Sequence, residues 1–290
     1  QAGRGVVVAE LSSWQLRDLR RYDREGRSRF TVSTVTSLFP DHMNSYSSFS
    51  EYVNDKRVVL QRLQPGSYAV LPTGVTGYLT RELPLSARQI IAFNREEVSI
   101  TINAVKHHLA QALPPHLLPV IGMGAALSLP LQEMVERVKS FPGLSHRQQI
   151  VGTLERITVI NDSAATVPEA VNYACESLNG SIHLITGGTD KGLQPGKMLA
   201  ACRRATSLTL LSGSFTDKLV PLLRENALPF RGPFGTMEEA CITAWELAVN
   251  DPSGMRSILM SPGSASFELF RNEFDRGDQF CSIFTDILQQ

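Results

Sequence analysis

The sequence predicts an α/β protein with two doubly wound domains, and three observations support this prediction. Short apolar or β-branched runs alternate with amphipathic helical segments, as in parallel sheets with right-handed crossovers. The length of 290 residues corresponds to about two domains at roughly 150 residues each. Small polar loops follow the expected strands, at the edge where open parallel sheets bind ligands.

The first half of the chain begins in an apolar run. Gly5 to Ala9 is free of charge, which is typical of a strand buried on both faces of a sheet. A chain that opens almost inside such a strand is expected to be a truncated form of a longer one. The pattern then predicts a helix from Ser12 or Ser13 to Tyr22, a strand over 30–36, a helix from Ser48 to about Leu63, and a strand over 68–71. The stretch 74–105 favours no single assignment.

The second half shows the alternation more clearly. Short buried strands are expected at 157–160, 182–186, 208–211 and 258–260, with helices at 168–178, 195–204, 216–226 and 237–249. The polar loops after these strands are Asn161 to Ser163, Gly187 to Lys191, Ser212 to Ser214 and Ser261 to Ser264. Because the carboxyl ends of parallel strands share one edge of a sheet, these loops predict a ligand site there. We expect one domain over 1–143 and another over 144–290.

Composition excludes several classes of protein. Apolar residues make up 42% of the chain and charged residues 19%, which indicates a globular protein. Twenty-eight basic residues balance 28 acidic ones, so neither a nucleic acid nor an anionic membrane is an expected partner. Residues 109–131 are almost uncharged, but four prolines argue against a membrane span. Four scattered cysteines indicate the reduced thiols of a cytoplasmic protein.

Three residues of the first half could contribute chemistry, and each also has an ordinary structural explanation. Glu10 follows the apolar run, where a carboxylate could bind a hard cation or simply cap the next helix. His42 follows the next strand and could ligate a metal or lie on the surface. Lys56 has apolar residues at helical spacing on both sides. Its amine is either desolvated and open to modification, or carried into water by its flexible stem.

Common catalytic motifs are absent. Gly122 and Gly124 half-match the dinucleotide-binding pattern G-x-G-x-x-G, but the third glycine and the later acidic residue are missing. The chain contains no G-x-S-x-G, no H-E-x-x-H and no G-x-x-x-x-G-K-[ST] phosphate loop.

Several segments, taken in order, resemble the Mur ligase family of amide ligases. In the first half they are Ala9 to Leu16 (AELSSWQL), Pro40 to Met43 (PDHM) and Tyr52 to Lys56. In the second half they are Gly143 to Arg147, Asn161 to Thr166 (NDSAAT), Gly187 to Lys191 (GGTDK) and Ser261 to Phe267 (SPGSASF). Their order and spacing resemble the D-glutamate-adding members, from Val6 nearly to the end of the chain. The resemblance implies an incomplete ATP-binding central domain and a Rossmann-like C-terminal domain that binds D-glutamate.

The resemblance also implies a reaction in peptidoglycan precursor synthesis. ATP would phosphorylate the L-alanine carboxylate of UDP-N-acetylmuramoyl-L-alanine. The amine of D-glutamate would then attack the acyl phosphate, and phosphate would leave. The implied cofactors are ATP, Mg²⁺ at two sites and a carbamylated Lys56, because Mg²⁺ offsets the charge of two anionic substrates. We expect a cytoplasmic monomer.

Site residues follow from the matched positions. Glu10, His42 and Lys56 resemble the Mg²⁺ ligands, with a carbamate on Lys56 supplying an anionic oxygen. Lys56, His42 and Arg147 would be the catalytic residues. Arg147 resembles the arginine that reaches the γ-phosphate, and Asp162 and His116 match positions near the nucleotide. The positions that would hold D-glutamate are Thr166, Lys191, Ser266 and Phe267.

The chain departs from the family pattern in several places. A uridine-nucleotide-binding N-terminal domain and the phosphate loop are missing from the sequence. Leu117 stands where an asparagine usually faces the adenine, Ala164 where many members have lysine, and Val167 where some have asparagine. Two alternatives therefore stay open: another Mur-type or folylpolyglutamate-type amide ligase, and a non-catalytic remnant without the phosphate loop. The loop from Ser261 to Phe267 favours the D-glutamate ligase.

Overall fold

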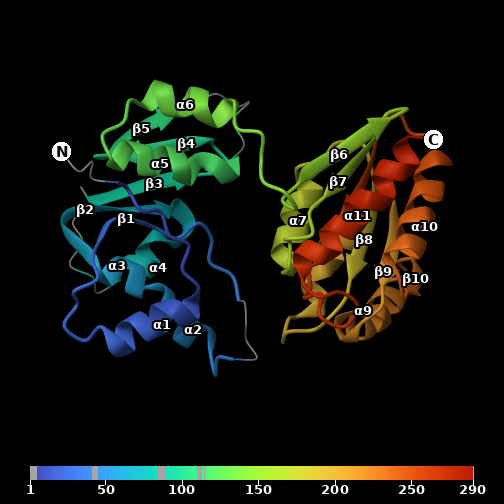
Figure 1. Cartoon of the computed structure of the whole chain (residues 1–290), viewed down its shortest axis with the longest axis horizontal. Coiled ribbons are helices and arrows are strands. Elements are labelled where there is room, and N and C mark those ends of the chain that lie inside the picture. The colour runs from blue at the N-terminus through green and yellow to red at the C-terminus, as the bar shows by residue number, and fades with distance from the viewer. Residues whose placement is uncertain are drawn as a thin grey trace. The chain divides into compact units, whose positions relative to one another are not determined.

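The computed structural model describes residues 5–40, 45–81, 83, 89–109, 113 and 115–289. These residues form two compact units, one of residues 5–40 and 46–141 and one of residue 45 and residues 142–289. Each unit has its own sheet (Figure 1). Each also has its own hydrophobic core. The predicted α/β class is confirmed.

The first unit contains a mixed five-stranded sheet. Its elements are α1 (Ser13–Tyr22), β1 (Phe30–Thr34), α2 (Phe49–Lys56), α3 (Val58–Gln61), β2 (Leu63–Pro72), η1 (Thr73–Val75), α4 (Thr76–Thr80), β3 (Ile90–Asn94), β4 (Ser99–Ile102), β5 (Val105–His108), η3 (Pro115–Leu117), α5 (Leu118–Ala126) and α6 (Leu131–Lys139). The strand order is β1-β2-β3-β4-β5, with β1 to β3 parallel and β3 to β5 antiparallel. Leu118 and Ile121 of α5 and Val135 of α6 pack on one face of this sheet.

The predicted strand Gly5–Ala9 is wrong. Residues 5–11 have no regular secondary structure, and Val6, Val7 and Val8 are 74%, 89% and 85% exposed. An apolar run becomes a buried strand only where a neighbouring strand offers it hydrogen-bond partners. β1 is the end strand of the described sheet, and its ladder partner is β2.

The predicted helix from Ser48 to Leu63 is interrupted. It begins as expected, with the Ser48 hydroxyl accepting a hydrogen bond from the Glu51 amide at 3.2 Å. It ends at Lys56, and a separate short helix follows Arg57. The Arg57 guanidinium donates to the carbonyl oxygen of Leu79 at 3.1 Å, and the β-branched Val58 is a weak helix former.

The second unit contains a six-stranded sheet covered on both faces. Its elements are β6 (Gln149–Leu154), β7 (Ile157–Asn161), α7 (Pro168–Glu176), β8 (Ser181–Gly187), η4 (Pro195–Met198), α8 (Leu199–Arg204), β9 (Ser207–Leu211), α9 (Ser214–Glu225), β10 (Arg231–Phe234), α10 (Met237–Val249), β11 (Arg256–Met260) and α11 (Glu273–Leu288). The strand order is β10-β9-β8-β11-β7-β6, and β6 is the antiparallel strand at one end. Helices α7, α8 and α9 pack on one face of the sheet, and α10 and α11 pack on the other (Figure 1).

Each strand predicted in the second half of the chain lies within an observed strand of this sheet. None of the helices in the described part of the chain is long and apolar enough to cross a bilayer.

Candidate functional site

Three polar loops meet at the carboxyl edge of the second sheet. They follow β7, β8 and β11, which are parallel neighbours in the order β8-β11-β7. Strands laid parallel end on the same side, so loops that are about 25 to 100 residues apart in sequence become adjacent. The loops that the sequence predicts to form a ligand site therefore follow neighbouring strands, and the site itself stays a prediction.

Main-chain hydrogen bonds join the three loops to one another. The amide of Gly263 donates to the carbonyl oxygen of Ala165 at 2.8 Å, which ties the β11 loop to the β7 loop. Thr189 and Ala265 exchange two hydrogen bonds of 3.0 Å, which tie the β8 loop to the β11 loop. Gly188 permits this approach, since its φ is +133° and a Cβ there would lie 2.8 Å from the oxygen of Ala265.

The structure brings together two of the residues matched to D-glutamate binding. The Lys191 ammonium lies 3.3 Å from the Thr166 hydroxyl oxygen, although the residues belong to different loops. Ser266 is buried in the third loop, and the adjacent Phe267 is 69% exposed. The edge therefore presents an ammonium and a hydroxyl group close together, and both can bind a carboxylate.

Asp162 lies below this surface and bonds parts of the chain to one another. It is 6% exposed, and one oxygen accepts from the Ser261 hydroxyl at 2.8 Å. The other oxygen accepts from the amide of Gln148 at 3.1 Å, next to Arg147. Burial raises the pKa of the Asp162 carboxyl to about 6, and the two hydrogen bonds and the Arg147 charge oppose that shift. Both carboxylate oxygens thus accept hydrogen bonds from within the protein. The contact of Asp162 with a nucleotide stays a prediction.

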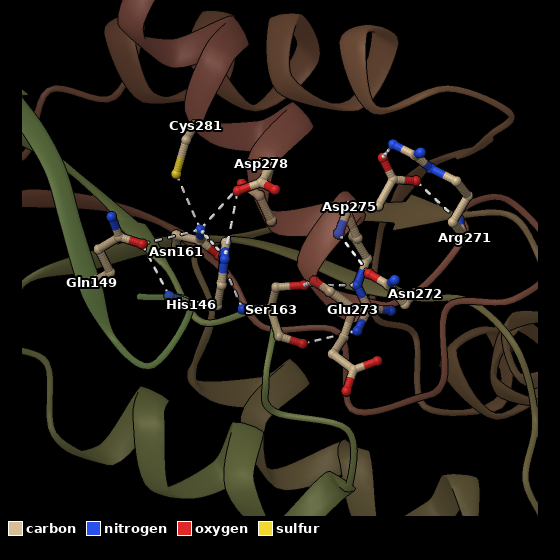
Figure 2. A network of polar contacts seen from close by, with 12 residues as sticks. His146, Gln149, Asn161, Ser163, Arg271, Asn272, Glu273, Asp275, Asp278 and Cys281 are labelled. Atoms are coloured by element: carbon tan, nitrogen blue, oxygen red, sulfur yellow. Dashed lines mark hydrogen bonds and ion pairs between the residues drawn. The ribbon is translucent and has the colours of Figure 1, made fainter. Parts of the chain in front are cut away.

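A second buried network surrounds the side chain of Asn161, which sequence analysis did not select. Figure 2 shows its amide nitrogen between His146, Gln149 and Cys281. The Asn161 oxygen accepts from the Ser163 amide, which fixes the amide so that its nitrogen donates to Nδ1 of His146 at 3.0 Å. Gly277 leaves room for this ring, because a Cβ there would lie 2.2 Å from Nδ1.

Arg147 follows this fixed histidine and is exposed. His146 adopts a left-handed φ of +63°, and its ring packs edge-on against Phe274 at 5.7 Å. The buried histidine therefore holds the turn from which the Arg147 guanidinium extends into solvent. Such a guanidinium is available to a phosphate group.

A further residue that sequence analysis missed is Arg276 in α11. It is fully buried and hydrogen-bonded to the loops after β7 and β11. An arginine near the start of a helix is usually a surface residue, so no sequence signal marked it.

Three further predicted residues, Glu10, Lys56 and His116, lie in the first unit. Glu10 is exposed in the irregular segment before α1, and His116 is exposed in η3. Lys56 is half-buried at the end of α2, with Nζ 5.6 Å from the centre of the Tyr52 ring. Its neighbour Asp55, which is buried, pairs with Arg20 at 2.6 Å. His42 lies outside the described residues.

The implied Mg²⁺ sites need several oxygen or nitrogen ligands close together. Among the described residues, no group of three or more His, Cys, Asp or Glu side chains could hold a metal ion. Lysine is not one of these residue types and His42 lies outside the described residues, so the assignment of Mg²⁺ to Glu10, His42 and Lys56 stays a prediction.

Comparison with known proteins gives consistent results for both halves of the chain. A family model described as the Mur ligase middle domain matches residues 1–113. The UDP-N-acetylmuramoylalanine--D-glutamate ligase of Borreliella afzelii is 29% identical, over 96% of this chain and 63% of that protein. The Treponema pallidum protein of the same name is 28% identical, over 95% and 67%. The chain thus spans about two thirds of the length of these curated relatives.

Solved structures of low sequence identity share the fold. The MurF ligase of Thermotoga maritima in complex with ADP has a TM-score of 0.65 at 11% identity, over 97% of this chain and 66% of that one. A pseudomurein peptide ligase type C from Methanothermus fervidus has a TM-score of 0.62 at 12% identity, over 96% and 66%. The chain is thus similar to Mur ligases in three respects: the middle-domain model that matches residues 1–113, the sequence similarity along most of its length, and the shared fold of its two sheets.

Proposed function

We propose that this chain forms the amino-acid-binding part, and part of the nucleotide-binding part, of a ligase that adds D-glutamate to UDP-N-acetylmuramoyl-L-alanine. The observation that supports this most is the approach of Lys191 to Thr166, 3.3 Å apart, on loops bonded to that of Ser266. An ammonium and a hydroxyl so placed fit a carboxylate of a small amino acid. The names of the relatives favour D-glutamate as that amino acid.

The proposed reaction needs two substrates held in line. ATP phosphorylates the alanine carboxylate, the D-glutamate amine attacks the acyl carbon, and the C–N bond forms as phosphate leaves. Lys191 and Thr166 hold a carboxylate of D-glutamate, which leaves its amine free to attack. Arg147 binds the γ-phosphate, with Asp162 and His116 near the nucleotide. The phosphate loop is absent from this sequence, so the complete reaction is proposed for a longer, cytoplasmic protein that contains this chain.

A binding measurement on the 290-residue chain tests the proposed amino-acid site. We expect calorimetry to show D-glutamate binding in preference to L-glutamate. Lys191→Met should weaken this binding at least tenfold, because a charged hydrogen bond to the carboxylate is lost, and should leave the melting temperature nearly unchanged. Lys139→Met, which removes an exposed ammonium from the first unit, is the matched control and should bind normally.

Two results would contradict the proposal. Equal or tighter binding of L-glutamate would favour the folylpolyglutamate-type alternative. Normal D-glutamate binding by Lys191→Met would place the amino acid elsewhere.

Glu10, His42 and Lys56 stay the proposed Mg²⁺ ligands of the longer protein, with Lys56 as a carbamate. The reaction of its neutral amine with CO₂ forms an N–C bond and releases a proton. We expect ¹³C-bicarbonate to give a carbamate NMR signal in the longer protein that disappears in Lys56→Ala, together with most of the ligase activity. A signal that persists in Lys56→Ala would remove this assignment, and the half-buried lysine over Tyr52 would then be a packing residue.

A further inference from the structure

The second unit buries one positive charge that the proposed reaction does not use. Arg276 lies in the first turn of α11 and is 0% exposed. All four hydrogen bonds from its guanidinium end on uncharged oxygens. Burial lowers its pKa to about 10, so the group still carries its charge at neutral pH. The nearby Glu273 carboxylate partly opposes this shift, but none of the four hydrogen bonds ends on a carboxylate. A buried charge without a hydrogen-bonded counter-ion is costly, which calls for a reason why it is kept.

The four hydrogen bonds divide evenly between two loops. Nε donates to the Ser163 hydroxyl at 3.0 Å and Nη2 to the Ser163 carbonyl oxygen at 2.8 Å. Nη1 donates to the carbonyl oxygens of Ser264 at 3.3 Å and Ala265 at 3.2 Å. One planar group thus joins the β7 loop to the β11 loop.

The same two loops contain the proposed ligands of D-glutamate. Ser163 lies three residues before Thr166, and Ala265 directly precedes Ser266. Ala265 is also paired with Thr189 of the β8 loop, two residues before Lys191. Arg276 therefore touches or adjoins every loop of the proposed amino-acid site.

Attachment of α11 to the sheet does not need this arginine. Phe280 and Phe284 of the same helix are fully buried in the core under α10, and Asn272 caps the helix by accepting from the Asp275 amide at 2.8 Å. The hydrogen bonds of Arg276 go instead to the loops at the edge of the sheet.

We propose that Arg276 is a positioning residue, whose guanidinium sets the relative places of Thr166, Lys191 and Ser266 through the main chain of their loops. The identification of D-glutamate as the ligand of these loops rests on the proposed function, whereas the coupling of the loops by Arg276 does not. A lysine keeps the charge but cannot bridge both loops, because it lacks the planar set of five donors.

Amide hydrogen exchange tests the coupling without any ligand. In Arg276→Lys and Arg276→Met, we expect the amides of Gly263 and Ala265 to exchange at least tenfold faster than in the unmodified chain. The amide of Ile258, in the middle of β11, should keep its rate. Arg271→Lys is the matched control, because its side chain is 87% exposed five residues earlier, and it should change neither rate. If Arg276→Met does not fold, Ser163→Ala removes one acceptor and should accelerate the same amides.

Calorimetry on the same variants tests the consequence for binding. Both Arg276 variants should bind D-glutamate at least tenfold more weakly. If Arg276→Lys exchanged its amides and bound D-glutamate as the unmodified chain does, the proposal would be overturned, since a positive charge alone would then be enough to position the loops. Equal acceleration at Ile258 would overturn it as well, since the effect would be general destabilisation. If the unmodified chain binds no D-glutamate, the proposed function fails, and the exchange result still decides the role of Arg276.

Discussion

Asp162 makes the second unit sensitive to mildly acidic pH. Its folded pKa of about 6 lies above the ordinary value of 3.8, because burial disfavours the charged carboxylate. Below pH 4 the group is protonated in the folded and unfolded states, and its contribution to stability is complete. That contribution is lost as the pH rises to about 6, where the folded carboxyl ionises, and it stays lost at higher pH.

Replacement by a neutral isostere should remove this dependence. Between pH 4 and pH 7 the free energy of unfolding of Asp162→Asn should rise relative to the unmodified chain, by up to about 3 kcal/mol at 1.4 kcal/mol per pKa unit. Urea unfolding of both proteins at several pH values measures the difference. Parallel profiles would show that the carboxyl titrates normally.

Sequence patterns pointed to some residues of the candidate site and could not point to others. Thr166 and Lys191 lie in short motifs directly after strands, so the resemblance and the topology placed them on one edge. Asn161 and Arg276 act through buried hydrogen bonds to distant segments, and Asn161 contacts Gly277 across 116 positions of sequence. Neither residue type nor spacing reveals such a partner before the fold is known.

The loops at the sheet edge behave as one element because their main chains are bonded to each other. Gly188→Ala should break this arrangement, since the new Cβ would lie 2.8 Å from the Ala265 oxygen at a φ of +133°. We expect the free energy of unfolding to fall by about 1–3 kcal/mol. We also expect D-glutamate binding to be lost. Gly196→Ala is the control, because no atom lies within 4 Å of its new Cβ and its φ is ordinary. Thermal unfolding measures the stability, and calorimetry measures the binding of D-glutamate. Equal stability of Gly188→Ala and Gly196→Ala would show that the loops do not need a glycine at position 188.

At the level of elements, the strands predicted at 30–36 and 68–71 correspond to β1 and to part of β2, the four strands predicted in the second half are all observed, and the strand predicted at Gly5–Ala9 is absent. The apolar runs of β7, β8, β9 and β11 can only be core strands in a doubly wound sheet. The hairpin of β4 and β5 was missed because its two-residue turn is Asn103-Ala104, at φ +50° and +65°, without the glycine that usually marks such a turn. The strand predicted at the run from Val6 to Val8 is wrong for a different reason. The run has the apolar pattern of a strand, but no described strand pairs with it.

The chain as a whole consists of two units with separate cores. The clusters in the second unit and the cluster on the first sheet share no residue. We therefore expect a fragment of residues 142–290 to fold by itself and unfold cooperatively. Its amide NMR spectrum should superimpose on the corresponding signals of the full chain at the site loops. A poorly dispersed spectrum of the fragment would show that the second core depends on the first unit.

The way Arg276 holds its loops has a consequence for how such a site can diversify. Three of its four acceptors are main-chain carbonyl oxygens, which every amino acid possesses. Side chains at Ala164, Val167 and Ala265 can therefore be exchanged while the backbone anchor remains. A library randomised at these three positions should sample different acceptor amino acids on an unchanged frame.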